Sequence, residues 1–155
     1  MTRWPTGSAT IERLLQEGRL QQVPANRDQA EHLVEQARRH VAAAASITEL
    51  DPAGGYQLTY DGARKALVAV LENQGLRPTH TGGHVVIYEA TMAQLERAVG
   101  QIIRPFNRMR RTRNDSEYPS GNSPRVTADD VIEDLVKAKA IIDVASRLLG
   151  EMDAF

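Results

Sequence analysis

The sequence predicts an all-α protein built as an up-and-down bundle of four to five helices. Apolar residues recur three and four positions apart along most of the 155 residues, which is the spacing that places them on one face of a helix. Aromatic residues make up only 5% of the chain, and the apolar positions are filled mainly by alanine, leucine, valine and isoleucine. No repeat of about 20 to 50 residues is visible, which excludes a solenoid.

The first two helices are predicted on either side of a proline. Apolar spacing predicts a short amphipathic helix from Ser8 to about Val23. A second helix starts at Asn26, a capping residue that precedes a glutamine by three positions. We therefore expect residues 1–25 to form an N-terminal helical extension and residues 26–155 to form the helical bundle.

The third helix is predicted to start at Asp51 and to end near Gln74. Asp51 supplies an N-cap side chain, and Pro52 suits the first helical position. Gly75 follows at the place where a left-handed C-terminal cap belongs. Residues 76–83 contain a proline and two glycines and are predicted to form a loop.

Two further helices complete the predicted bundle. One runs from His84 towards Tyr118, and Pro105 is expected to kink or restart it because proline lacks the N–H donor of a helical residue. The Gly- and Pro-rich residues 119–124 are predicted to form a loop. The last helix starts after a capping box at Thr127 and runs to the C-terminus. Its predicted apolar stripe consists of Ile132, Leu135, Ala138, Ile142, Ala145, Leu149 and Met152.

Composition and charge exclude several classes of protein. The chain has no cysteine, which excludes disulfides, thiolate metal sites and a cysteine nucleophile. Residues 1–8 lack the apolar region of a signal peptide and no run of about 18 apolar residues follows, so we expect no membrane span and a cytoplasmic protein. The net charge is −1, so nucleic-acid binding would have to come from a local patch. We recognise no metal-ligand pattern and no phosphate-binding glycine loop, and expect neither a metal nor a cofactor.

Five arginines stand close together in this slightly acidic chain. Arg104, Arg108 and Arg111 fall on one face of a helix, and Arg110 and Arg113 fall on a neighbouring face. Guanidinium groups bind phosphate oxygens through paired hydrogen bonds, so we expect the four arginines before Arg113 to bind RNA or nucleotide phosphates. The alternative is a solvated helix face on which nearby carboxylates pair with the arginines.

The residues around this cluster resemble a known family. Arg113 is followed by Asn114 and, five positions after the arginine, by Tyr118. Upstream, residues 60–67, 71–78 and 82–84 are Tyr-Asp-Gly-Ala-Arg-Lys-Ala-Leu, Leu-Glu-Asn-Gln-Gly-Leu-Arg-Pro and Gly-Gly-His. Together these segments resemble the HEPN family, helical domains that include many RNA-cleaving toxins and defence ribonucleases. The resemblance covers roughly residues 28–150.

What this resemblance implies is a HEPN-like bundle that forms a homodimer, whose two copies face a shared, positively charged cleft that binds RNA. Toxins of the family are commonly encoded beside a nucleotidyltransferase antitoxin, which would be a second partner. The family's signature is an arginine, usually followed by a polar residue, then four to six intervening positions and a histidine. In this chain Tyr118 stands where the histidine is expected.

Metal-independent RNA cleavage needs a base for the ribose 2′-hydroxyl, a cation for the phosphorane and an acid for the leaving 5′-oxygen. The resemblance implies that Arg113 binds the scissile phosphate, that Asn114 orients Arg113 or donates a hydrogen bond across the dimer, and that Tyr118 occupies the histidine position. Because nearby arginines lower the pKa of a tyrosine, Tyr118 is a candidate phenolate base; stacking on a nucleobase, donation to a phosphate and packing inside the bundle are its other roles. Glu117 is an auxiliary candidate as a substitute base, and His84 is another if it moves into the cleft. The structural alternatives are a helix C-cap for Asn114, a solvated carboxylate for Glu117 and a loop or capping role for His84.

Three functions remain open. The first is a HEPN-type endoribonuclease, a toxin of a toxin–antitoxin or defence system. The second is a catalytically inactive HEPN module that binds RNA, a nucleotide or a partner protein such as a nucleotidyltransferase, and the third is an oligomerisation bundle. The retained Arg113–Asn114 pair favours the first function over the third, whereas the missing histidine favours the second. We place the ribonuclease first, and by analogy Tyr118 is then a candidate acceptor of a nucleotidyl group.

Overall fold

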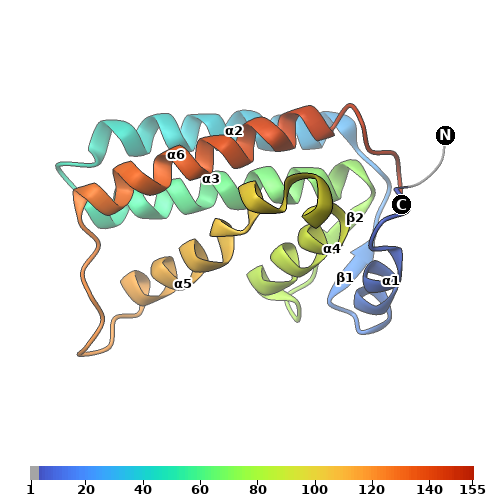
Figure 1. Ribbon diagram of the computed structural model, residues 1–155, viewed down its shortest axis with the longest axis horizontal. Helices are drawn as coiled ribbons and strands as arrows, with labels where there is room; N and C mark the ends of the chain where they lie inside the picture. The colour runs from blue at the N-terminus through green and yellow to red at the C-terminus, as the bar shows by residue number, and fades with distance from the viewer. Residues whose placement is uncertain (1–3) are drawn as a thin grey trace.

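The computed structural model describes residues 4–155, which form six helices and one two-stranded antiparallel sheet (Figure 1). The helices are α1 (Ser8–Gln16), α2 (Arg27–Ile47), α3 (Pro52–Asn73), α4 (Gly83–Ile103), α5 (Pro105–Glu117) and α6 (Ala128–Leu148). The strands are β1 (Leu20–Gln22) and β2 (Leu76–Pro78). The prediction of a helical bundle is confirmed. The described residues form six helices rather than four or five, and the small sheet was not predicted. Residues 1–3 of the predicted N-terminal extension lie outside the described residues.

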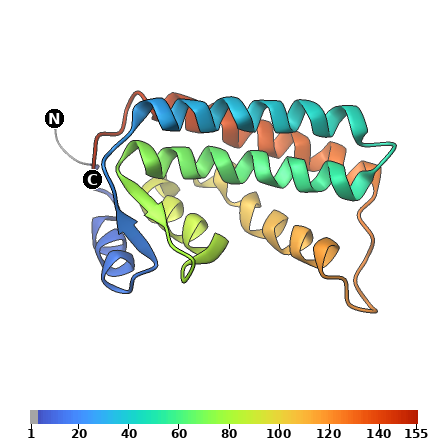
Figure 2. The same cartoon turned by 180° about the vertical axis from the view of Figure 1, so that it is seen from behind.

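The long helices α2, α3 and α6 form one group, and α4 and α5 lie on the side of α3 and α6 that faces away from α2 (Figures 1 and 2). In Figure 1, α3 and α6 run from left to right, α2 runs the opposite way, and α5 leads back to the left-hand end. α1 and the sheet lie at the right-hand end, beside the C-terminus. None of the helices in the described range is both long and apolar enough to cross a membrane.

The core of the bundle has a small-residue side and an aromatic side. The buried residues of α2 are all alanine or valine: Ala30, Val34, Ala37, Val41 and Ala44. They let α3 approach closely, since a Cβ added at Gly62 would stand 2.9 Å from Cγ1 of Val41. On the side of α3 that faces α5, Tyr60 stacks on Phe106 with ring centroids 5.2 Å apart. Both rings are fully buried, so they anchor α5 to α3.

Three predicted N-caps are present. The Asn26 side chain accepts a hydrogen bond of 2.9 Å from the backbone N–H three residues on, and Asp51 accepts one of 3.0 Å in the same way. At the start of α6, Thr127 and Asp130 exchange both hydrogen bonds of a capping box. Caps satisfy N–H groups that have no partner inside the helix, so the local sequence determines where α2, α3 and α6 begin.

The prediction that the first helix extends to about Val23 is wrong. α1 ends at Gln16, and Gly18, with φ of 70°, turns the chain into β1. β1 pairs with β2 in antiparallel register, with Leu20 opposite Pro78, so part of the predicted loop over residues 76–83 is a strand. A pairing between segments so far apart in sequence is a tertiary contact, which helical periodicity cannot show.

Pro105 restarts the helix, which confirms one of the two predicted outcomes and separates α5 from α4. The predicted last helix is too long, because α6 ends at Leu148 rather than at the C-terminus. The prediction that Ile132 faces the core is also wrong, since this side chain is 51% exposed. Val131 is buried in its place and packs beside Gly55 of α3. The contact with α3 therefore decides how α6 is rotated at its N-terminal end.

Candidate functional site

The arginines at the start of α5 and along it face two directions. One group lines a pocket of about 480 Å³, whose basic residues are Arg104, Arg108, Arg111 and Lys137. Arg110 and Arg113 lie on the other side of the helix, where their charges act on Tyr60 of α3 and His84 of α4. The two faces that the sequence predicts are therefore present.

The pocket, which we call the α5 groove, carries positive charge. Arg104 is exposed, and its ion pair with Glu96 is long, at 3.8 Å. Arg111 is exposed and makes no ion pair with any residue in the described range. Tyr88 of α4 also lines the groove and offers an aromatic surface. Arg104 and Arg111 thus remain available to an anionic ligand.

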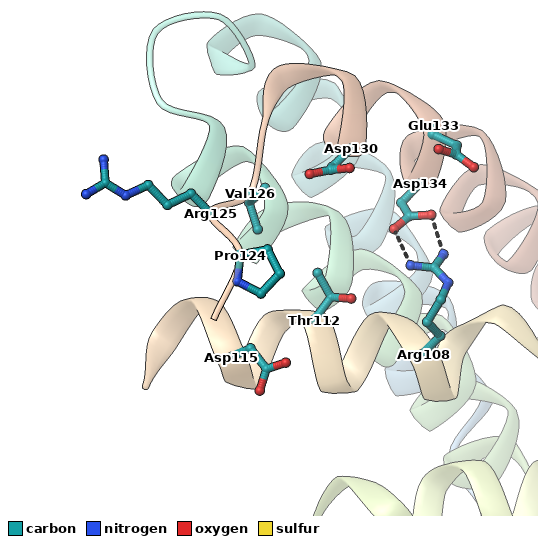
Figure 3. Close-up of a pocket in the computed structure, with 9 residues that line it drawn as sticks. All are labelled: Arg108, Thr112, Asp115, Pro124, Arg125, Val126, Asp130, Glu133 and Asp134. Carbon is teal, nitrogen blue, oxygen red and sulfur yellow. Dashed lines mark hydrogen bonds and ion pairs between the residues drawn. The ribbon is translucent and has the colours of Figure 1, made fainter. Parts of the chain in front are cut away.

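Arg108 has a structural partner (Figure 3). Its Nη1 and Nη2 donate to the two carboxylate oxygens of Asp134 on α6 at 3.1 and 2.6 Å. Asp134 is only 3% exposed and also accepts a hydrogen bond of 2.6 Å from the Tyr56 hydroxyl. Burial acts to raise the pKa of Asp134, but the bonds from Arg108 and Tyr56 outweigh it and hold this pKa below its usual value. The Arg108 charge is therefore largely balanced by a buried carboxylate that links α5 to α6.

The carboxylates Asp115 and Glu117 also lie on α5, but within the described residues neither makes an ion pair with its arginines. In Figure 3, Asp115 lies on α5 away from the Arg108–Asp134 pair, and Arg125 extends away from the other labelled side chains. Glu117 accepts a hydrogen bond of 2.6 Å from Gln57 of α3.

Arg113 is held by neutral groups. Its Nε donates to the Gln57 side-chain oxygen at 3.0 Å, and its Nη1 donates to the Asn114 side-chain oxygen at 3.3 Å. Its Cζ lies 6.0 Å from the centre of the Tyr60 ring. No carboxylate in residues 4–155 pairs with it, so its charge is not balanced by an ion pair.

His84 of α4 contacts the same Tyr60 ring. Its Nδ1 is 2.9 Å from the Tyr60 hydroxyl, and the two ring centroids are 5.7 Å apart. Burial lowers the pKa of His84, and the positive charges of Arg64 and Arg113 lower it further. Burial raises the pKa of Tyr60, although the same arginines oppose the shift. At neutral pH the imidazole is therefore uncharged and the phenol keeps its proton.

These residues form what we call the arginine–histidine cluster: Arg64, Arg110, Arg113, Tyr60 and His84. Arg64 donates to Asp61 at 3.2 Å, and Arg110 donates to Asn107 at 3.3 and 3.2 Å. Of the three guanidinium groups, only that of Arg64 pairs with a carboxylate, so the cluster carries a net positive charge. Such an arrangement can bind a phosphate beside a neutral imidazole.

Tyr118 lies at the end of α5 and is 76% exposed. Its backbone N–H donates to the Asn114 carbonyl at 2.8 Å. The suggested packing of this ring inside the bundle is therefore wrong, because the loop that follows α5 carries the chain away from the core. The suggested C-cap role of Asn114 is also wrong, since Tyr118 itself is the C-cap.

Sequence reasoning missed three members of the site, Gln57, Tyr60 and Arg64. They stand at successive turns of α3, three and four residues apart, so they share one face of that helix. Only the packing of α4 and α5 against Tyr60 shows its contact with His84 and Arg113.

The described residues contain no group of three or more histidine, aspartate or glutamate side chains placed to hold a metal ion. Comparison of the chain with protein-family models, curated proteins and solved structures gave no significant match.

Proposed function

We propose that the protein is an RNA-cleaving enzyme of the HEPN type, in which Arg113 binds the scissile phosphate and His84 acts as the base. The observation that carries this proposal is the contact of both residues with Tyr60, which brings an unpaired guanidinium and a neutral imidazole to one buried ring. A histidine from α4 would thereby supply the group that the sequence lacks at Tyr118.

The reaction needs no metal. The ribose 2′-oxygen attacks the phosphorus, and its proton passes to Nε2 of His84. The bond from phosphorus to the 5′-oxygen breaks, and the leaving oxygen takes a proton from water. The products are a 2′,3′-cyclic phosphate and a 5′-hydroxyl end. Arg113, with Arg110 nearby, offsets the charge that develops on the phosphorane oxygens.

Tyr60 has a positioning role in this scheme. When His84 donates its Nδ1–H to the Tyr60 oxygen, Nε2 is left with a free lone pair, which is the state that a general base requires. Burial keeps Tyr60 protonated, so the ring adds no negative charge beside the phosphate.

The other residues are assigned by position. Arg104 and Arg111 in the α5 groove bind phosphates farther along the RNA. The exposed Tyr118 is free to stack on a base, and it is also open to modification by a nucleotidyltransferase antitoxin. A second copy of the chain, as in the family that the sequence resembles, would enlarge the cleft.

The test is cleavage of total RNA in EDTA by the wild type, Arg113→Ala and His84→Asn. Each substitution is expected to lower the rate constant about a hundredfold or more, because each removes a group that acts in the transition state. Arg38→Ala is the matched control, since Arg38 is an exposed arginine of α2 that pairs with Asp143. Cyclic phosphate ends on the products are expected. Equal cleavage by wild type and both site variants would place any activity outside this cluster.

The alternative function is RNA binding without turnover. It is favoured by Tyr118 at the histidine position. The exposed tyrosine ring can stack on a nucleobase, but it does not supply the general base that cleavage requires. In that case the wild type binds RNA with an affinity that falls steeply with salt, and RNA incubated with it stays intact.

A further inference from the structure

A second pocket adjoins the arginine–histidine cluster. It measures about 580 Å³ and lies between α3, the β1–β2 sheet and the start of α4. We call it the sheet pocket, and its polar lining residues are Gln21, Arg64, Arg77, Thr79, His80 and His84. Arg64 and His84 belong to the cluster as well, so the two sites are continuous.

The lining of the sheet pocket favours an anionic ligand. It includes two arginines and two histidines, and none of the side chains that the described part of the chain contributes to it is acidic. Arg77 is held by a buried carboxylate, because its Nε donates to Glu72 at 2.8 Å and Glu72 is only 5% exposed. This bond raises the pKa of Arg77. Glu72 therefore holds the Arg77 guanidinium in place at the pocket and offsets part of its charge, as Asp61 does for Arg64.

The pocket also has an apolar wall, formed by Val68, Pro78 and Ile87. Phosphate alone would not need such a wall, whereas the flat face of a nucleobase packs well against aliphatic side chains. Gln21 also lines the pocket, and side-chain amides hydrogen-bond to base edges. The volume lies within the range of small-ligand sites, about 300 to 1,000 Å³.

We propose that the sheet pocket binds one nucleotide, with its phosphate on Arg64 and Arg77 and its base between Val68, Ile87 and Gln21. Its place as the nucleotide next to the cut bond rests on the proposed function, because His84 borders both sites. Binding of the nucleotide itself does not require cleavage and is measurable alone.

The experiment is calorimetric titration of the full chain with AMP, GMP, CMP and UMP, and with adenosine and inorganic phosphate as separate probes. At least one nucleotide is expected to bind more than tenfold tighter than either adenosine or phosphate, because only the nucleotide carries both a phosphate for the arginines and a base for the apolar wall. Arg77→Gln is expected to weaken nucleotide binding fivefold or more. Arg38→Gln, which removes an exposed arginine elsewhere, is expected to change it less than twofold.

Gln21→Ala is a second test that should not disturb folding, because Gln21 is exposed on β1 and its side chain is not part of the core. It is expected to reduce the difference in affinity among the four nucleotides. Gln22→Ala is its control, since Gln22 is the neighbouring exposed strand residue and lies outside the lining of the pocket. If no nucleotide binds better than phosphate, or if Arg77→Gln and Gln21→Ala both bind like wild type, the pocket is not a nucleotide site.

The two proposals fail separately. A protein that binds nucleotides through Arg77 but leaves RNA intact contradicts the ribonuclease and keeps the pocket. A protein that cuts RNA with dependence on Arg113 and His84, but binds no nucleotide, keeps the ribonuclease and removes the pocket.

Discussion

Tyr60 shows how one buried side chain can organise chemistry supplied by others. It contributes a hydroxyl to His84, a ring face to Arg113 and a stacking surface to Phe106. His84 comes from α4, Phe106 and Arg113 both come from α5, and Tyr60 itself lies on α3. Its role in the proposed reaction can therefore be separated from its role in packing by removing the hydroxyl alone.

Tyr60→Phe keeps the ring and removes only the oxygen that contacts His84. We expect the rate constant of RNA cleavage to fall about tenfold, since outer contacts that set a histidine's tautomer typically matter by that much. KM should stay nearly constant because Arg113 and the α5 groove are untouched. Steady-state kinetics of both proteins, with unfolding midpoints as the control, tests this; an unchanged rate constant would show that Tyr60 only packs.

The pH dependence of cleavage follows from the environment of His84. Burial and the charges of Arg64 and Arg113 disfavour the imidazolium, so the pKa of His84 lies below its usual value of 6.5. The base is competent above that lowered pKa, and we expect the rate to be constant at neutral pH and to fall only on stronger acidification. The same shift contributes stability that is present above pH 6.5 and is lost as the pH falls through the folded-state pKa. Rate profiles from pH 4 to 8 test the sign, and a rate that rises on acidification would contradict it.

Asp134 is a residue whose role is stability. In Asp134→Asn the buried carboxylate that Arg108 and Tyr56 share is lost, and we expect the free energy of unfolding to drop by about 2 kcal/mol. Because the pKa of Asp134 is lowered, the loss should be full above the usual value of 3.8 and should shrink below it. Urea denaturation measures it. Asp143→Asn removes an exposed carboxylate paired with Arg38 and should cost less than about 0.5 kcal/mol.

At the scale of elements, the close contact between α2 and α3 can be probed by a single substitution. A Cβ at Gly62 would lie 2.9 Å from Val41 and 3.1 Å from the Ala37 carbonyl oxygen, which is backbone and cannot move aside. At Gly100 of α4 a Cβ would meet only the flexible side chains of Glu96 and Arg104, at 3.3 and 3.5 Å.

Gly62→Ala should therefore destabilise the fold by about 1 to 3 kcal/mol, because overpacking outweighs the gain in helix propensity. Gly100→Ala is the matched control and should be neutral or stabilising. Thermal unfolding of the two variants decides the matter. Equal stability of Gly62→Ala and wild type would mean that α2 and α3 can move apart without loss.

At the scale of the whole molecule, the distribution of charge matters more than its sum. The net charge is −1, yet the α5 groove and the arginine–histidine cluster place basic residues on and around α4 and α5. α2 lies on the far side of α3 and α6, as Figure 2 shows. RNA is therefore expected to bind the α4–α5 side.

Replacing both Arg104 and Arg111 by alanine should weaken RNA binding and reduce the slope of log affinity against log salt by about 1.4, roughly 0.7 for each phosphate contact on a single strand. Arg38→Ala combined with Arg147→Ala removes two exposed arginines of α2 and α6 and should leave the slope unchanged. Fluorescence anisotropy with a labelled single-stranded RNA at several salt concentrations measures both. Equal slopes for the two double variants would place the RNA elsewhere.

The sequence by itself determined the helical class, the capped starts of α2, α3 and α6, the restart at Pro105 and the two faces of the arginine cluster. All of these depend on residues within about four positions of one another, where backbone hydrogen bonding and helical spacing act. Only the tertiary structure decided that β1 pairs with β2, that Arg108 is bound by Asp134, and that His84 meets Arg113 across Tyr60. The hydrogen-bonded partners Tyr60 and His84 are 24 positions apart, and Tyr56 and Asp134 are 78 apart. Which side chains meet over such separations depends on how whole helices pack, and no local pattern encodes that.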